Sequence, residues 1–474
     1  MKLALRNNIF LWASVFFMLI LTVAIIADQY YLLLIPFGLL LFYSGWRSLT
    51  TAFLILIASI PFSTEYQFSD TLGTDLPDEL LMLLVSALMS FHLLQNVERF
   101  KQWVSHPLLL FLFTLLCWGM IATMFSTYPL MSAKYMLAKA WYLGSFVFGA
   151  LLVWIDKESL RRSGLTLAIS MLLVTGIILF RHGLESFSFA SVSDVVHPFF
   201  RNHVNYSSLL VCTLPVWFAC WKLSTSESVK RLTVLVLIIL LAALFFSYAR
   251  GAWLALIAGI LVYWLIKKRI VVKALLALFL LASISLAWLI HDNRYLDFAP
   301  DHNTTIFHED FREHLVATYE MTDMSTAERF YRWIAGVKMI GERPLAGFGP
   351  GTFYQNYKAY AVPAYETWVS DNPERSTVHN YFFLMASEQG IPALIFLLIL
   401  VTSVIYYAQR LYHRTGDIFY KMIAIITGVV FSMILVLNFL SDLVETDKIG
   451  SLFFLCIAAL VATDIQTRVI KPQP

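Results

Sequence analysis

Arginines at the ends of apolar segments are the residues in this sequence best suited to chemistry. The clearest case is Arg250, which stands between two apolar runs and precedes Gly251, whose backbone permits a tight turn. A guanidinium stays charged at any physiological pH and matches the geometry of a phosphate group. A charge at the edge of a membrane helix costs free energy unless it snorkels or pairs. Arg250 is therefore either a snorkelling or salt-bridged residue or a ligand for an anion.

A second basic group lies near residue 330. If this segment is helical, Arg329, Arg332 and Trp333 share one face. Further along comes the glycine-rich turn Pro344–Gly351. Such a turn can cradle phosphate, but this one lacks the lysine of a P-loop and does not follow a strand. We therefore favour a structural turn over a phosphate-binding loop.

The third group is His379 with Asn380, followed by Glu388 at the start of the next apolar run. Imidazole titrates near neutrality, so it can take a proton from a hydroxyl group. On a continuous helix Glu388 points away from His379, and it can orient the histidine only if the segment is broken. A lone histidine is usually a polar surface residue, but this one follows the arginine-rich segment. We weigh these two interpretations equally.

These groups need elements that position them, and the composition predicts membrane helices. Of 474 residues, 59% are hydrophobic and 14% are charged, and the mean hydropathy is +0.72. A soluble domain carries about 25% charged residues. Apolar runs of about 18 residues can each cross a bilayer core, and about fourteen occur here. They cover approximately residues 9–27, 30–46, 48–62, 79–95, 107–125, 135–154, 163–180, 205–221, 231–248, 251–266, 271–290, 391–409, 421–440 and 449–463.

Lysine and arginine gather in alternate connections, which the positive-inside rule assigns to the cytoplasm. Lys267–Arg269 is one example, whereas the intervening connections are acidic or neutral. Both termini are therefore predicted to lie inside. We expect an all-α bundle of about 12–14 helices with a large, mostly helical outer loop. The helices occupy 1–290 and 391–474, and the outer loop, which carries the chemistry, occupies 291–390.

Several cationic residues fall on the outer side, against this rule. Besides the arginines above they include Lys139, and Arg201 with His203 at the entry to a span. In that entry segment Asn202 or Asn205 caps a helix. Alternatively, the segment forms a second polar wall of the cavity that would bind the anionic ligand. We leave these two readings open. Together the outer cations predict an anionic ligand at the membrane boundary.

Other candidate groups favour structure over chemistry. The four cysteines lie inside apolar runs without a metal-type pair, which predicts buried thiols rather than disulfides. His302, His308 and His314 lack the spacing of zinc motifs. No paired-aspartate motif occurs on the outer side, so we expect no metal and no other cofactor. The net charge of +3 gives no reason to expect a nucleic-acid partner. The run at 9–27 lacks a cleavage site and is predicted to be a retained helix.

The order of the three groups along the chain, and their predicted location on one side of the membrane, resemble those of the O-antigen ligase/polymerase superfamily of bacterial membrane glycosyltransferases. The carrying residues are Arg250–Trp253, the helix around Arg329 with its glycine turn, and the segment from His379 to Gly390. The resemblance implies an inner-membrane protein whose active site faces the periplasm. It also implies that Arg250 and Arg329 bind a diphosphate, with Arg332 as the alternative to Arg329, and that His379 is essential.

The implied donor is a glycan carried on undecaprenyl diphosphate in the membrane lipid. A ligase moves this glycan to lipid A–core oligosaccharide, whereas a polymerase moves it to another carrier-linked repeat unit. The arginines suit the charge that develops on the leaving diphosphate, and His379, kept neutral by them, suits the acceptor proton. The predicted substrate-binding residues are Arg332, Arg201, His203, Lys139, Asn380 and Glu388. A transporter of lipid-linked glycan is a weaker alternative, because no internal repeat is visible.

Overall fold

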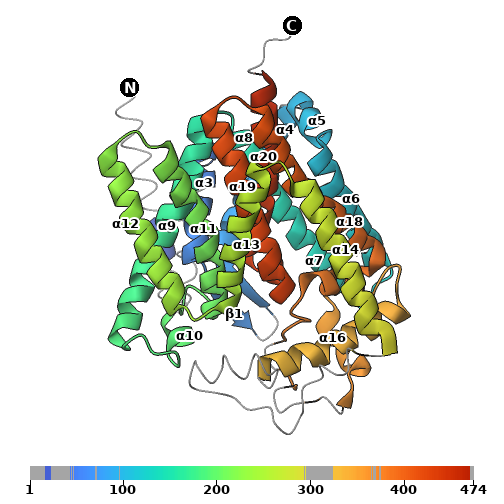
Figure 1. The fold of residues 1–474 in the computed structure, drawn as a ribbon. Helices are drawn as coiled ribbons and strands as arrows, with labels where there is room; N and C mark the ends of the chain where they lie inside the picture. The colour runs from blue at the N-terminus through green and yellow to red at the C-terminus, as the bar shows by residue number, and fades with distance from the viewer. Residues whose placement is uncertain are drawn as a thin grey trace.

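Membrane-spanning helices form most of the structure. The computed structural model describes residues 17–22, 43, 45, 47–69, 72–95, 97–292, 294, 324–363, 366, 370–372 and 375–469. Within these residues eleven helices are long and apolar enough to cross a membrane. They pack side by side in one bundle (Figure 1). The protein is an all-α polytopic membrane protein, as its sequence predicts.

The spanning helices begin and end at polar or glycine-containing connections. They are α4 (Asp78–Gln95), α6 (Pro107–Met124), α7 (Pro129–Tyr142) continued by η3 (Leu143–Gly149) and α8 (Ala150–Val153), α9 (Lys157–Leu184), α11 (His203–Leu223), α12 (Glu227–Phe246), α13 (Arg250–Lys267), α14 (Val271–Ile290), α18 (Tyr381–Arg414), α19 (Ile418–Leu440) and α20 (Asp447–Val469). Shorter elements are α3 (Leu49–Ser59), η2 (Ile60–Phe62), α5 (Val97–Val104), α10 (Val192–Val195), α16 (Met324–Glu342), α17 (Phe353–Asn356), η5 (Tyr357–Tyr360), η7 (Leu443–Glu445), β1 (Thr64–Ser69) and β2 (Leu72–Leu76).

The spanning helices agree with eleven of the predicted spans. The span predicted at 48–62 is the short helix α3 followed by the single turn η2. The spans predicted at 9–27 and 30–46 lie mostly outside the described residues. The largest difference in bounds is at α18, which begins at Tyr381 rather than at residue 391. Its first ten residues are polar enough to escape an apolar-run search, yet they contain the predicted Glu388.

Several helix starts follow directly from the local sequence. Asp156 accepts a hydrogen bond from the Ser159 backbone at 2.8 Å and forms a capping box at the start of α9. The Asn202 side chain accepts from the Asn205 N–H at 3.0 Å and caps α11. The cap reading of the 202–205 segment is therefore confirmed.

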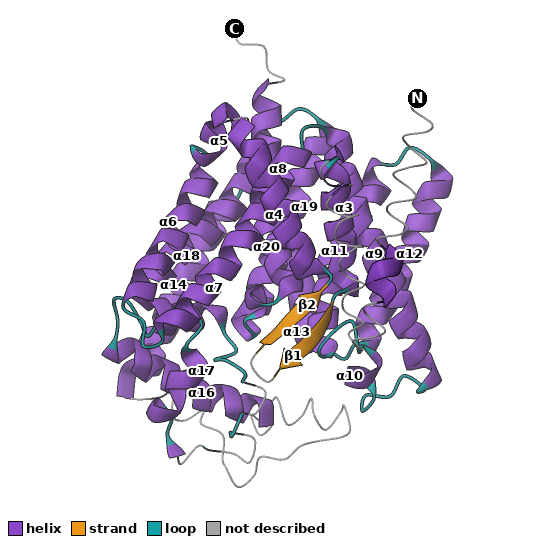
Figure 2. Ribbon diagram, turned by 180° about the vertical axis from the view of Figure 1, so that it is seen from behind, coloured by secondary structure: helices purple, strands orange, loops and turns teal. Residues whose placement is uncertain are grey.

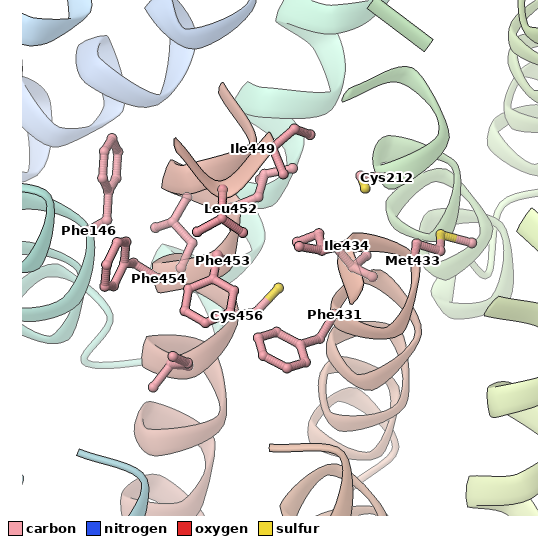
Figure 3. Packing of buried hydrophobic residues seen from close by; sticks show 14 of the residues in the cluster. Phe146, Cys212, Phe431, Met433, Ile434, Ile449, Leu452, Phe453, Phe454 and Cys456 are labelled. Atoms are coloured by element: carbon pink, nitrogen blue, oxygen red, sulfur yellow. The ribbon is translucent and has the colours of Figure 1, made fainter. Parts of the chain in front are cut away.

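The core of the bundle lies around α19 and α20, the two most enclosed spans among the described residues. Figure 3 shows Phe431 and Ile434 of α19 against Phe453 of α20. The Phe431 and Phe453 rings lie 5.1 Å apart. Cys456 is part of this packing, and its thiol is buried in apolar surroundings. The peripheral helix α14 contributes little to the core.

Glycine allows α13 to lie close against α19. A Cβ added to Gly259 of α13 would lie 2.3 Å from Cε of Met433 on α19. A Cβ added to Gly428 of α19 would lie 2.7 Å from Cδ1 of Ile266 on α13. Small residues at such contacts permit the close helix approach that stabilises membrane bundles. This packing fixes α13, and with it Arg250, relative to α19.

A two-stranded antiparallel hairpin is the main departure from an all-helical chain. The strands β1 and β2 pair Thr64 with Leu76 and Glu65 with Asp75 (Figure 2). The sequence predicts only an acidic connection there. The hairpin pairs the backbone N–H and C=O groups of a short connection with one another. So small an element has no apolar periodicity from which it could be predicted.

The two ends of the bundle differ in charge and architecture. One end carries α5, α8 and connections with Lys157, Lys267 and Arg414, and we call it the basic end (Figure 1). The opposite end carries the hairpin, α10 and α16 (Figures 1 and 2), and we call it the site end. The described part of the 291–390 segment folds mainly as helices α16 and α17 with the turn η5.

Candidate active site

His379 lies at the site end, immediately before the cap of α18. Asn380 accepts hydrogen bonds from the backbone of Phe382 and Phe383 at 3.0 and 3.1 Å, which caps the helix. The Asn380 amide also donates to the Phe439 carbonyl of α19 at 3.0 Å. Asn380 therefore fixes the start of α18 against the end of α19, and His379 with it.

The segment after α19 holds the same region from the other side. The Tyr381 N–H donates to the Ser441 carbonyl at 3.0 Å. The Thr377 hydroxyl donates to the Asp442 carboxylate. One residue on each side of His379, two positions away, is thus tied to the residues that follow α19. The histidine sits on a backbone held from both directions.

Helix α16 brings Arg332 against the imidazole. Its Nη1 lies 2.9 Å from Nε2 of His379 and donates to the Thr377 carbonyl at 3.3 Å. Its Nη2 donates to Glu328 at 3.1 Å, one helical turn away. The Ser370 hydroxyl in turn donates to Glu328 at 2.6 Å. Arg332 is only 4% exposed, so this guanidinium is anchored by three partners in a largely dry place.

The α16 helix is also fixed through its aromatic residue. The Trp333 indole N–H donates to the Val378 carbonyl at 3.0 Å. Its ring meets Phe383 edge to face, with centroids 5.8 Å apart. The helical face predicted to carry Arg329, Arg332 and Trp333 therefore does face the His379 segment.

The electrostatic surroundings keep His379 neutral. Burial lowers the pKa of its imidazole to about 3, and the charges of Arg332 and then Arg329 act in the same direction. Each cation disfavours a second positive charge nearby. Arg329 stands three residues before Arg332 in α16 and therefore shares its helical face.

Arg250 begins α13 at the same end of the bundle. A Cβ on the next residue, Gly251, would lie 3.3 Å from Leu440 at the end of α19. The neighbouring Phe439 is the residue that accepts the Asn380 amide. The starts of α13 and α18 therefore meet around the end of α19. Arg250 and His379 lie at one end of the molecule rather than on opposite faces of a membrane.

Both helix starts follow a residue with an unusual backbone. Tyr248 and His379 have φ angles of 55° and 52°, in the left-handed region. Non-glycine residues in this region cost about 1–3 kcal/mol and persist only where the surroundings hold them. The Tyr248 hydroxyl donates to the Phe187 carbonyl at 2.8 Å, which anchors the first of them.

The glycine-rich turn locks into a kink of α18. Gly390 has a φ of 81°, and a Cβ there would lie 2.0 Å from the Leu345 carbonyl oxygen. The Glu388 carboxylate accepts from the backbone N–H groups of Gly351 and Phe353, each at 2.8 Å. The structural reading of the turn is supported: its N–H groups are used by the protein itself.

A comparison with protein families finds a match that lies almost entirely in the second half of the chain. Residues 235–398 match the family model described as O-antigen ligase. This match supports a relationship of the chain to the O-antigen ligase superfamily. The match begins in α12 and ends in α18, so it contains Arg250, α16 and His379. A search of curated proteins found no match. The family supports a multi-pass bacterial membrane protein with a ligase- or polymerase-like glycosyltransferase activity.

The remaining predicted site residues lie elsewhere in the structure, and Lys139 and His203 contact other side chains. Lys139 forms an ion pair with Glu445 at 2.9 Å and is nearly buried. His203 contacts the Ser193 hydroxyl at 2.8 Å through Nδ1, within its own connection. Arg201 is exposed at the start of α11. The contacts thus bring together Arg332, Asn380 and His379, whereas the carboxylate of Glu388 belongs to the glycine turn.

Sequence reasoning missed the polar groups that hold Arg332 and the His379 segment in place. Glu328 stands four residues before Arg332, and this spacing could have indicated a helical ion pair. Ser370 and Asp442 carry no such signal, because their partners lie 42 and 65 residues away. Within the described residues no cluster of histidine, cysteine and carboxylate side chains could hold a metal ion. The histidines at 302, 308 and 314 lie outside the described residues.

Proposed function

We propose that this protein transfers a preassembled glycan from undecaprenyl diphosphate to the lipid A–core oligosaccharide. The observation that carries the proposal is the meeting of guanidinium groups and one neutral imidazole where two spanning helices begin. A diphosphate at a membrane boundary needs cationic ligands. An acceptor hydroxyl needs a group that can take its proton.

The cations suit a diphosphate leaving group. We assign its recognition to the guanidinium groups of Arg250 and Arg329. Arg332 is anchored by Glu328 and the Thr377 carbonyl and can offer a further N–H donor. The N-termini of α13 and α18 add partial positive charge at the same place. Charge that builds up on the departing diphosphate is stabilised most effectively by donors fixed in advance in a partly dry site.

The reaction needs no redox step. The acceptor oxygen bonds to the anomeric carbon as the bond from that carbon to the phosphate oxygen breaks. The electron pair leaves with the diphosphate. The acceptor proton passes to Nε2 of His379 and then to water. We propose that the reaction is independent of metal ions, because arginines supply the positive charge.

The orientation follows from the charge distribution. Lysines and arginines gather at the basic end, which we assign to the cytoplasm by the positive-inside rule. The site end then faces the periplasm, and both termini lie inside. The undecaprenyl chain would lie in the surrounding lipid with its diphosphate at the boundary.

A polymerase is the second candidate, because both activities use the same donor and the same leaving group. Deletion of the gene separates them when lipopolysaccharide is analysed by gel electrophoresis. A ligase deletion removes all long chains and accumulates carrier-linked polymer. A polymerase deletion leaves the core with one repeat unit. A transporter would move labelled glycan across a vesicle membrane without joining it to any acceptor.

The site assignment is tested with purified protein in lipid nanodiscs, carrier-linked glycan and lipid A–core. We expect Arg250→Ala and Arg329→Ala each to lower transfer by about 10²–10³-fold. Lys338→Ala is the matched control, because Lys338 is an exposed cation of α16. Wild-type rates in both arginine variants would refute the assignment.

A further inference from the structure

The Arg332–His379 contact defines which imidazole nitrogen carries the proton. A guanidinium has only donors and stays charged. Its Nη1, 2.9 Å from Nε2 of His379, therefore donates to that nitrogen. Nε2 is the acceptor, and the single proton of the neutral ring is on Nδ1. The nitrogen that should receive the acceptor proton is thus occupied in this structure.

The charge of the group that contacts the imidazole is opposite to that found beside most catalytic histidines. In a hydrolase triad a carboxylate contacts the far nitrogen and strengthens the near nitrogen as a base. Here a cation contacts the imidazole directly, and no carboxylate among the described residues bonds to either ring nitrogen. Two acids of the site, Glu328 and Asp442, bond to Arg332 and Thr377 instead.

A diphosphate would compete for the same guanidinium. A hydrogen bond from arginine to a phosphate oxygen is charged on both sides and about twice as strong as a neutral one. Arg332 can exchange its bond to Nε2 for one to phosphate while Glu328 and the Thr377 carbonyl keep it in place. Its buried Nε–H also lacks a hydrogen-bond partner among the described residues.

We propose that Arg332 covers the proton-accepting nitrogen of His379 until a diphosphate takes over one of its N–H donors, so that the histidine becomes a base only with the glycan donor bound. This inference rests on the proposed function. Arg332 then contacts the bound diphosphate and also controls whether Nε2 of His379 is free to accept a proton. Once Nε2 is free, it takes the proton of the attacking hydroxyl as the anomeric carbon–oxygen bond to diphosphate breaks.

The charges around the ring support the same sequence of events. The cations that face His379 are Arg329 and Arg332 of α16, whereas Glu328 and Asp442 lie behind Arg332 and Thr377. Burial and these cations hold the pKa of His379 at about 3. A bound diphosphate offsets the cations and raises that pKa. Protonation of His379 and diphosphate binding must therefore favour each other.

Proton uptake on binding tests this coupling directly. Geranyl diphosphate is titrated calorimetrically into the full-length protein in nanodiscs at about pH 5.5, in buffers of different ionisation enthalpy. At a pH between the free and bound pKa of His379, binding takes up protons. We expect wild type to take up more protons than His379→Gln, by a difference that approaches about one proton. The ligand's own titration is common to both proteins and cancels.

Further variants separate the two proposals. Arg332→Gln removes the cation, so the resting pKa of His379 rises and the excess proton uptake falls. Lys338→Gln removes an exposed cation of the same helix and should match wild type. Binding with equal uptake in wild type and His379→Gln would overturn the covering role of Arg332 and leave the diphosphate site intact. Absence of any saturable binding would overturn the proposed function itself.

Discussion

Two histidines at opposite ends of the bundle face opposite charges. At the basic end, Nε2 of His106 lies 3.0 Å from the carboxylate of Asp464. Its Nδ1 accepts the Leu108 N–H at 3.3 Å, so Nε2 carries the proton and donates. At the site end, Nε2 of His379 accepts from Arg332. Within the described residues, His106 is satisfied at both nitrogens and His379 at one.

The surrounding charges follow the same contrast. Asp464 is completely buried and forms ion pairs with Arg414 and Arg468 as well as its contact to His106. This carboxylate ties α20 to α18 and to the start of α6. The site end instead places two arginines near a neutral imidazole. At the basic end a carboxylate contacts the imidazole, whereas at the site end a cation, itself paired with Glu328, contacts it.

The largest expected effect comes from comparing these two histidines. We expect His379→Gln to lower glycan transfer by about 10²–10⁴-fold, because the acceptor loses its base. We expect His106→Gln to lower the stability by about 1–2 kcal/mol and to keep the transfer rate per folded molecule. Transfer assays and thermal unfolding of both variants in nanodiscs measure the difference.

This prediction fails if His106→Gln loses as much activity per folded molecule as His379→Gln. It also fails if His379→Gln transfers glycan normally. Size-exclusion chromatography of both proteins provides the folded fraction needed for the comparison.

The backbone that supports the site gives the next effect. A Cβ on Gly390 would lie 2.0 Å from the Leu345 carbonyl, at a φ of 81°. We expect Gly390→Ala to destabilise the protein by about 3 kcal/mol and to displace the glycine turn. Gly341→Ala is the matched control, because a Cβ at Gly341 meets nothing within 4 Å. Equal melting temperatures for the two variants would show that the turn does not depend on the kink.

Much of the fold could be predicted because each spanning helix is a local signal. An apolar run of sufficient length predicts a spanning helix, and Asn202 predicts the start of a helix. The contacts of the site are different. Asp442 meets Thr377 only because α19 returns to the site end, and no spacing along the chain encodes that return. The role of Glu388 depends on the glycine turn, which packs against α18 at Gly390 and brings the N–H groups of Gly351 and Phe353 to this carboxylate.

The ion-pair network at the basic end predicts a smaller effect. We expect Asp464→Asn to lower the free energy of unfolding by about 2 kcal/mol, because charge-assisted hydrogen bonds to Arg414 and Arg468 weaken. Glycan transfer per folded molecule should stay unchanged. Denaturation curves and transfer assays on the same preparation measure both quantities. A loss of transfer without a loss of stability would contradict a purely structural role for the basic end.

The smallest effect tests whether Lys139 is a structural cation or a ligand for the diphosphate. Its ammonium pairs with Glu445, which also accepts from the Tyr135 hydroxyl at 2.7 Å. We expect Lys139→Met to destabilise the protein, because Glu445 then lacks its cation, and the double variant with Glu445→Leu to recover most of the loss. The KM for the carrier-linked donor should change by less than about twofold, because a lysine that does not contact the donor does not contribute to its binding. A large rise in KM in both variants would instead place Lys139 among the diphosphate ligands.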